Sequence, residues 1–329
     1  MVDHDRNIKF YHTRVVQHKR RNIINMLKDN DNNWIEDEDN IRALFHDHFK
    51  KFFTTNIKTH GWFQTEQQFP ALRNGVSRAL QSEVHESEIK QTPFDMETWK
   101  SPGLDGFPIG FYQNTWQHIG DNIFSFISQL WRKDLSLEDI NYTDISLIAK
   151  LDNPQLVTHF RPIALCNTIY KVFTKIIVNR FKQHTDNIVS PNKAGFIPNR
   201  SVHDNIVIAQ EILHSMHISK RKVGSFAIKI DHAKAYDNMN LNFINNVLTE
   251  VGIPNNLKDL IMLVVTFVKL QVLWKGDSRY FFEAKKGLQQ GHPLSPYLFV
   301  LYMDKLSHLI HDVVENNHWN FLKIGKEGP

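Results

Sequence analysis

One carboxylate in the sequence lies where a strand is expected to end. The stretch Ser225–Asp237 reads SFAIKIDHAKAYD, in which apolar residues alternate with small or polar ones. This period of two predicts a strand with one packed and one open face, and it places Asp231 at the strand end on the open face. A rigid carboxylate followed five residues later by Tyr236 suits a metal-dependent site beside an aromatic wall. A surface strand that ends in an Asp-initiated turn has the same pattern, so both interpretations stay open.

Basic residues gather near the start of the chain. Residues 1–28 hold seven Lys and Arg against two Asp, with aromatic residues among them. Cations interleaved with rings suit phosphates and stacked bases, whereas a solvated amphipathic helix would have the same composition. The candidate nucleic-acid contacts are Arg14, Lys19, Arg20 and Arg21.

Three further stretches have a constrained backbone. Residues 97–108, ETWKSPGLDGFP, crowd turn-forming residues before a long amphipathic stretch. Backbone N–H groups at such a helix entrance can receive a phosphate, although a plain surface turn would look alike. Arg161 precedes Pro162, which keeps Arg161 extended and directs its guanidinium, either toward a ligand or into a structural ion pair. Residues 286–296, KGLQQGHPLSP, form a third turn-rich loop.

Composition limits the kind of protein. With 329 residues, 41% of them hydrophobic, the chain can bury the core of one large or two ordinary domains. Lys and Arg exceed Asp and Glu by 39 to 35, a balance that permits a polyanionic partner without requiring one. The single cysteine, Cys166, excludes a disulfide framework and a Cys-based zinc site, and its apolar neighbours predict burial. Because no apolar run reaches 18 residues, we expect a soluble, intracellular protein without a membrane partner.

Hydrophobic periodicity predicts the elements around these features. Strands are expected at Thr143–Lys150 and in a hairpin on either side of residues 275–278, while residues 54–80 are expected to form a loop-rich connector. Apolar residues at helical spacing predict helices near 41–52, 107–131, 169–185, 202–216, 241–251, 257–269 and 298–310, with Ser201 as an N-cap.

Five ordered blocks then resemble a known family. They are SPGLDGF, FRPIALCNTIYKVFTKIIVNR, AGFIPNRSVHDNIVIAQE, AIKIDHAKAYD and KGLQQGHPLSPYLF. In this order they resemble the reverse transcriptase region of plant LINE-type non-LTR retrotransposons, and the basic opening resembles the segment that precedes the polymerase there. The resemblance covers nearly the whole chain, and five blocks at sensible intervals are far more specific than any one of them.

The resemblance implies an α+β right-hand polymerase fold, helix-rich with a small antiparallel sheet. Residues 1–80 would be a basic helical segment and connector, 81–220 a fingers-like region, and 221–329 a partial palm. Members of the family synthesise DNA on an RNA template, extending a DNA primer with dNTPs and using two Mg²⁺ ions. The family implies that this takes place in the nucleus. Its motifs imply that Asp231 is the first metal ligand and catalytic carboxylate. The implied nucleotide contacts are Arg161, Tyr236 as a wall against the ribose 2′-hydroxyl, Gln290 and Gly291.

The sequence also departs from the family pattern. The next family block, an aromatic residue followed by Ala-Asp-Asp, supplies the remaining carboxylates, but the chain holds no Asp-Asp pair and stops at Pro329, about where that block is expected. Asp304 is a poor substitute, because its place on the last helix predicts a surface position. In the nucleotide loop, Lys286, Gln289 and His292 replace two cations and an acid of the usual R-G-L-R-Q-G-D-P-L-S-P.

These observations favour an RNA-directed DNA polymerase domain that is inactive as this chain, since one Asp cannot hold two Mg²⁺ ions. A non-catalytic nucleic-acid-binding remnant or domesticated module is the alternative function. A product that never folds stably is a third possibility. The oligomeric state is left open by the sequence.

Overall fold

The computed structural model describes residues 13, 16, 23–55, 62–138, 140–219, 224–277 and 280–320. The candidate contacts Arg14, Lys19, Arg20 and Arg21 therefore lie outside the described residues. The described helices are α2 (Glu38–Thr54), α3 (Asn74–Gln81), α4 (Glu86–Phe94), α5 (Ile109–Arg132), α6 (Thr168–Lys182), α7 (Thr185–Ile188), α8 (Val202–Ile218), α9 (Leu241–Glu250), α10 (Asn255–Thr266) and α11 (Ser295–Glu315), with a 3₁₀ turn at Val157–His159. The described strands are β1 (Leu27–Lys28), β2 (Trp34–Ile35), β3 (Tyr142–Ala149), β4 (Phe160–Cys166), β5 (Lys269–Val272) and β6 (Phe282–Glu283).

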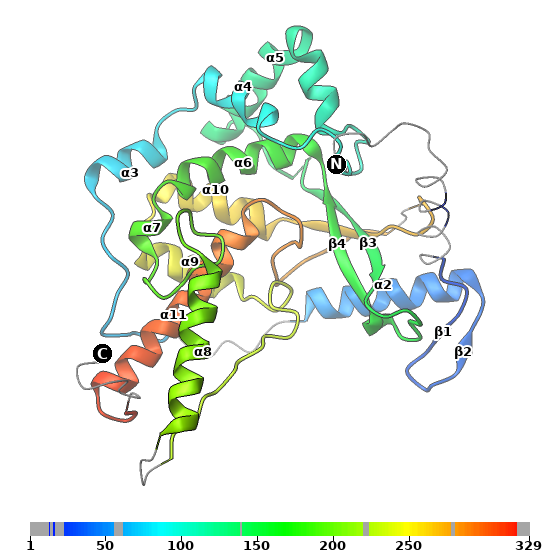
Figure 1. Ribbon diagram of the computed structural model, residues 1–329. Coiled ribbons are helices and arrows are strands. Elements are labelled where there is room, and N and C mark those ends of the chain that lie inside the picture. Colours follow the sequence, from blue (N-terminus) through cyan, green and yellow to red (C-terminus); the bar gives the residue numbers. More distant parts are fainter. Residues whose placement is uncertain are drawn as a thin grey trace.

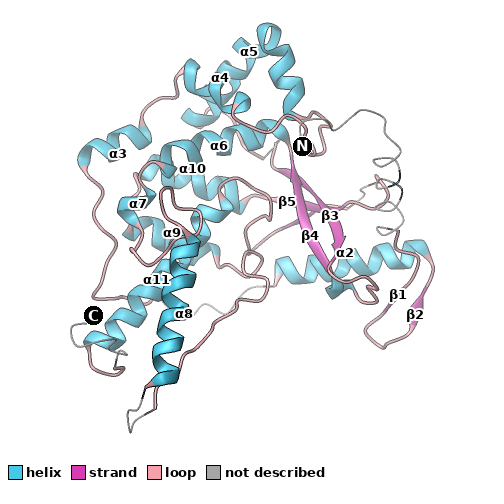
Figure 2. Cartoon of the chain, viewed as in Figure 1, coloured by secondary structure: helices cyan, strands magenta, loops and turns pink. Residues whose placement is uncertain are grey.

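The larger sheet has four strands in the order β4-β3-β5-β6 (Figure 2). β3 pairs antiparallel with β4 and parallel with β5, and β5 pairs antiparallel with β6. The helix-rich α+β class with a small sheet is thus confirmed, and the sheet expected to be antiparallel contains one parallel pair, β3 with β5. A parallel pair needs a long crossover, and the helices between β3 and β5 supply it.

Two apolar cores hold the elements together. In the first, α2 packs against the sheet, and Phe45 of α2 is fully buried with its ring centroid 5.2 Å from that of Phe160 and 5.8 Å from that of Trp274. Burial of one such side chain contributes about 1.5–3 kcal/mol. α2 begins after Asp37, whose carboxylate accepts a hydrogen bond from the Asn40 N–H at 2.9 Å.

The second and larger core joins α4–α6 and α9–α11, which lie together in Figure 1. Cys166 is fully buried, as its apolar setting predicts. The prediction for Asp304 is wrong, because this carboxylate is fully buried and accepts a hydrogen bond from the Ser190 N–H at 2.9 Å. Its helix is covered on that side by the loop after α7, a contact that helical spacing alone does not reveal.

The predicted strand around Asp231 does not form. Residues 224–232 have no regular secondary structure, and Phe226, Ile228 and Ile230 are 83%, 67% and 62% exposed. A strand is held by hydrogen bonds to a neighbouring strand, and none of the described strands pairs with this stretch. The alternation therefore leaves three large apolar side chains in solvent, and Asp231 lies on an exposed loop.

Two more expectations are revised by the structure. Helix α3 interrupts the connector expected at 54–80, and it anchors there through Leu80, which is fully buried. Helix α8 projects from the rest of the molecule in Figure 1 and buries none of its residues, although Ser201 caps it as predicted by accepting from the His203 N–H. No helix in the described part of the chain combines the length and apolarity needed to cross a bilayer.

Candidate functional site

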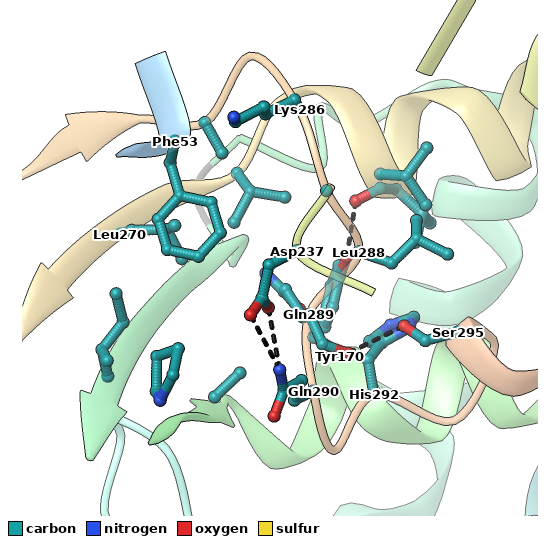
Figure 3. A pocket seen from close by; sticks show the side chains of 18 residues that line it. Phe53, Tyr170, Asp237, Leu270, Lys286, Leu288, Gln289, Gln290, His292 and Ser295 are labelled. Carbon is teal, nitrogen blue, oxygen red and sulfur yellow. Dashed lines mark hydrogen bonds between the residues drawn. The ribbon is translucent and has the colours of Figure 1, made fainter. Parts of the chain in front are cut away.

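A pocket lies where the sheet meets the loop that follows β6 (Figure 3). The pocket is narrow, with a cavity volume of about 30 Å³ for the centre of a water-sized sphere, and it is walled mainly by apolar side chains of the sheet and α10. Its polar side comes from Asp237, from residues 286–290 and from His292 and Ser295. Apolar walls with a few converging polar groups occur in small-molecule sites, but a ligand as large as a nucleotide would lie at the mouth of this narrow cavity rather than within it.

The most prominent polar contact in the pocket joins Asp237 and Gln290. The Gln290 side-chain amide donates to the two carboxylate oxygens of Asp237, at 2.9 and 3.0 Å. Asp237 is only 2% exposed, and burial raises the pKa of its carboxyl group to about 6. The Gln290 bond and nearby lysines oppose that rise because they favour the ionised form.

The loop that carries Gln290 is fastened on both sides. The N–H groups of Gly287 and Leu288 donate to the carbonyls of Met239 and Tyr236, each at 2.8 Å, and the Ala164 N–H donates to the Gln290 carbonyl at 3.0 Å. Gly287 has φ +84°, and a Cβ there would lie 2.6 Å from the Asp237 carbonyl oxygen. This glycine therefore permits both the backbone turn and the close approach.

Three lysines lie near Asp237 on separate segments: Lys150 after β3, Lys234 before Asp237, and Lys286 in the loop. Arg161 on β4 lies near Lys150. The pKa values of the Lys150 and Lys286 ammonium groups are lowered, first by burial and then by neighbouring cations. The Lys234 and Lys286 nitrogens each lie 4.4 Å from the ring centroid of Phe52 on α2. Such a group of cations suits a multiply charged anion.

Behind the loop, uncharged polar groups fix its inner half. The Cys166 thiol donates to the Gln289 side-chain oxygen at 2.9 Å, and the Gln289 amide donates to the Thr143 hydroxyl at 3.0 Å. His292 is 4% exposed, and burial lowers the pKa of its imidazole to about 3. His292 is therefore neutral at physiological pH, and the acid expected at this position is replaced by an uncharged ring.

Comparison with models of protein families shows which family the chain belongs to. Residues 148–322 match the model of the family described as reverse transcriptase (RNA-dependent DNA polymerase). The chain belongs to the reverse transcriptase family. The match includes β4, the pocket loop, Asp231 and α11.

Relatives of this reverse transcriptase chain occur in transposable elements. It is 24% identical over 310 residues to the "Transposon TX1 uncharacterized 149 kDa protein" of Xenopus laevis, covering 92% of this chain and 23% of that protein. It is 25% identical over 225 residues to the "Retrovirus-related Pol polyprotein from type-2 retrotransposable element R2DM" of Drosophila melanogaster, covering 68% of this chain and 20% of that protein. The chain thus spans less than a quarter of the length of these two relatives.

The pocket brings together only some of the predicted residues. Gln290 lies in it, and Gly291 has φ +100° directly after it. Arg161 does not line the pocket: Pro162 and Ala164 of β4 do, and Arg161 is exposed on the other face of the strand. Arg161 forms no ion pair among the described residues, so the structural alternative for it has no support there. Tyr236 packs against Phe299 with ring centroids 5.0 Å apart.

Asp231 stands apart from the pocket lining. Its side chain is exposed, and the described residues contain no group of three or more His, Cys, Asp or Glu side chains able to hold a metal ion. Asp231 can offer one oxygen ligand, whereas Asp237 already receives two hydrogen bonds from Gln290. The described residues therefore do not form a site for two Mg²⁺ ions, which need several carboxylates.

Three residues of the site were missed by sequence reasoning. Lys150, Lys234 and Asp237 each lie in a stretch that the sequence singles out, because Lys150 ends the predicted strand and the other two follow Asp231. The available signal was that these charged residues lie close in sequence to the predicted strand or to Asp231. Their convergence depends on contacts between segments far apart in the chain, which no local pattern encodes.

Proposed function

We propose that the chain is the fingers and part of the palm of an RNA-directed DNA polymerase from a non-LTR retrotransposon, of the plant LINE type that its motifs resemble. Residues 1–80 would precede the polymerase, residues 81–220 form the fingers-like region, and residues 221–329 contribute to the palm. The family membership supports the class of reaction. The expected site of action is the nucleus, with an RNA template, a DNA primer and dNTPs as partners.

The observation that carries the proposal is the group of three lysines near Asp237, with Arg161 close to Lys150, next to a loop fastened by backbone hydrogen bonds. In the reaction, the primer 3′-hydroxyl attacks the α-phosphate of a dNTP, a P–O bond forms, and pyrophosphate leaves. The triphosphate is highly charged, and Lys150, Arg161, Lys234 and Lys286 supply the positive field that would hold it. Gln290 and Gly291 would contact the base or sugar from the loop.

Two further roles are proposed from the family motifs. Tyr236 would close the space beside the sugar and so exclude a ribose 2′-hydroxyl. Asp231 would give one ligand to a metal ion and act as the catalytic carboxylate. Mg²⁺, when bound, would stabilise charge on the reacting phosphoryl oxygens. Because the described residues offer no second set of ligands, we expect this chain to bind nucleotides without incorporating them.

Two assays test this proposal. Titration with a fluorescent dNTP should show binding that weakens about tenfold in Arg161→Gln, on the scale of one lost charge-assisted hydrogen bond. Primer extension on an RNA template with Mg²⁺ and dNTPs should show no incorporation. Absence of dNTP binding would contradict the proposed class, whereas robust synthesis that depends on Asp231 would contradict the inactivity.

A non-catalytic nucleic-acid-binding module is the second candidate, favoured by the exposed, solitary Asp231. It predicts salt-dependent RNA binding that survives Asp231→Ala and falls when Lys19, Arg20 and Arg21 are neutralised. If the unmodified chain binds RNA but no dNTP, the non-catalytic module is favoured over the polymerase.

A further inference from the structure

Residues 225–232 have the residue pattern of a strand but no partner strand. Phe226, Ile228 and Ile230 are exposed in this stretch, and residues of these types favour strands. Within the described part of the chain, residues 225–232 make no hydrogen bond through backbone or side chain. The stretch therefore presents unpaired N–H and C=O groups together with large apolar side chains, which is a template for pairing with another chain.

Helix α8, which precedes this stretch in the chain, is uncovered in the same way. It buries none of its residues, and Ile206, Ile208 and Leu213 are among its exposed apolar side chains. In Figure 1 the chain runs back from the free end of α8 toward the rest of the molecule through residues 225–232. Two consecutive segments thus expose apolar side chains, and such extended exposure marks a contact with another chain.

The order of residues in the stretch suits pairing with a second copy of itself. In antiparallel strands, directly opposite residues share a face, and a two-fold axis at Ile230 places this residue opposite its own copy. The same axis places Lys229 opposite Asp231 of the second copy, and Asp231 opposite the second Lys229, so two opposite-charge pairs form. Ile228 then lies opposite His232 of the second copy, on the face that carries Ile230.

The neighbouring symmetric registers are less complementary. An axis at Lys229 would place two ammonium groups opposite each other, and like charges in that position are destabilising. An axis at Ile228 would place Lys229 and Asp231 opposite uncharged residues, so neither charge would gain a partner. The charges therefore favour the register with Ile230 at the axis, and they favour a second copy of this chain as the partner.

We propose that residues 228–232 pair antiparallel with the same residues of a second copy, so that the chain forms a two-fold symmetric dimer. A two-stranded ribbon is only marginally stable by itself in water, and the exposed apolar side of α8 supplies a cover for its apolar face. Pairing would engage Asp231 with Lys229 of the second copy. The inference goes beyond the proposed function and does not depend on it, because the dimer requires no nucleotide.

Sedimentation velocity of the whole chain over a wide range of concentrations tests the dimer. Lys229→Glu and Asp231→Lys should each weaken dimerisation about twofold to thirtyfold, because each places like charges opposite one another at two symmetric positions. Lys229→Glu combined with Asp231→Lys restores opposite charges and should recover most of the affinity. Lys90→Glu is the matched control, since Lys90 is exposed on α4, far from α8 in Figure 1, and should leave dimerisation unchanged.

Disulfide cross-linking measures the register. Directly opposite Cα atoms lie about 4.5–5.5 Å apart, which a disulfide spans. Ile230→Cys should therefore give a covalent dimer on mild oxidation. In Ile228→Cys the two sulfurs would lie about four residues apart along the ribbon and should not join. The native Cys166 is fully buried and does not compete.

The outcomes separate the inference from the proposed function. A monomer at every concentration, open-ended polymers, a charge exchange that restores no affinity, or cross-linking of Ile228→Cys but not Ile230→Cys would each overturn the dimer. Dimerisation by a chain that binds no dNTP would keep the inference and refute the proposed function, and dNTP binding by a strict monomer would do the reverse. Urea unfolding of each variant checks that the fold is intact.

Discussion

Asp237 accepts both of its carboxylate hydrogen bonds from a single partner, Gln290, which lies 53 residues further along the chain. One bond is 2.9 Å and the other 3.0 Å, and the pair is enclosed by apolar walls. The contact orients the side-chain amide of Gln290, and it connects the turn after Asp231 with the loop that we expect to meet a nucleotide. The behaviour of this pair is therefore central to the site.

Removing either Asp237 or Gln290 should lower the unfolding free energy of the protein. In a double-mutant cycle of Asp237→Ala and Gln290→Ala, we expect a coupling of about 1.5–3 kcal/mol in unfolding free energy, the range for a hydrogen bond to a charged group. Chemical denaturation at neutral pH measures it. Additive single-variant effects would contradict the pairing, and Gln81→Ala, at the end of α3, is a control glutamine on the surface.

The Asp237 carboxyl group should also give the protein a particular pH dependence. Its pKa is raised to about 6 from an ordinary 3.8, so the folded state binds more protons than the unfolded state between these values. Stability should therefore fall as the pH rises from about 4 to about 6, by about 3 kcal/mol from this group. Asp237→Asn should remove that contribution, and equal pH profiles for both proteins would refute it.

Gly103 should tolerate no side chain. A Cβ would lie 2.4 Å from backbone atoms of Cys166 and Asn167, which cannot move aside, so Gly103→Ala should destabilise the protein by about 1–3 kcal/mol. Gly75→Ala is the matched control: no atom lies within 4 Å of its Cβ position, and α3 should gain up to about 1 kcal/mol. Thermal unfolding compares the two variants. An unchanged stability of Gly103→Ala would show that the turn can move away from Cys166 and Asn167.

Removing one member of the buried ion pair of Lys305 and Glu250 should lower the stability of the protein more than replacing both members together. Lys305 is 1% exposed, and its ammonium donates to Glu250 at 2.6 and 2.7 Å and to Thr65. Lys305→Met should cost about 3–5 kcal/mol because it leaves a carboxylate unpaired, whereas Lys305→Met with Glu250→Leu should recover much of that loss. Denaturant midpoints test this, and a double variant as unstable as the single one would contradict it.

Helix α8 should accept polar residues at no cost to the fold. Ile208 and Leu213 are 55% and 54% exposed, and the helix buries none of its residues. Ile208→Lys should change the unfolding free energy by less than about 0.5 kcal/mol and should reduce self-association. Ile176→Lys, in the fully buried part of α6, is the destabilising comparison. A large loss of stability in Ile208→Lys would show that α8 is packed in solution.

The amino-acid sequence by itself determined most of the longer helices, because each depends on contacts three and four residues apart that an apolar stripe records, whereas the short helices α3, α4 and α7 were not predicted. α5 and α6 lie within a few residues of their predicted ranges, and Ser201 caps α8. Ordered motifs predicted the family for the same reason, since each motif is local. The burial of Cys166 followed from its apolar neighbours.

Only the tertiary structure decided features that need a distant partner. The alternation before Asp231 does not become a strand without a neighbouring strand, and the parallel pairing of β3 with β5 depends on the helices between them. The burial of Asp304 and the bond from Gln290 to Asp237 join segments 114 and 53 residues apart. Such contacts are set by how whole elements pack, and a local pattern of residue types carries no record of them.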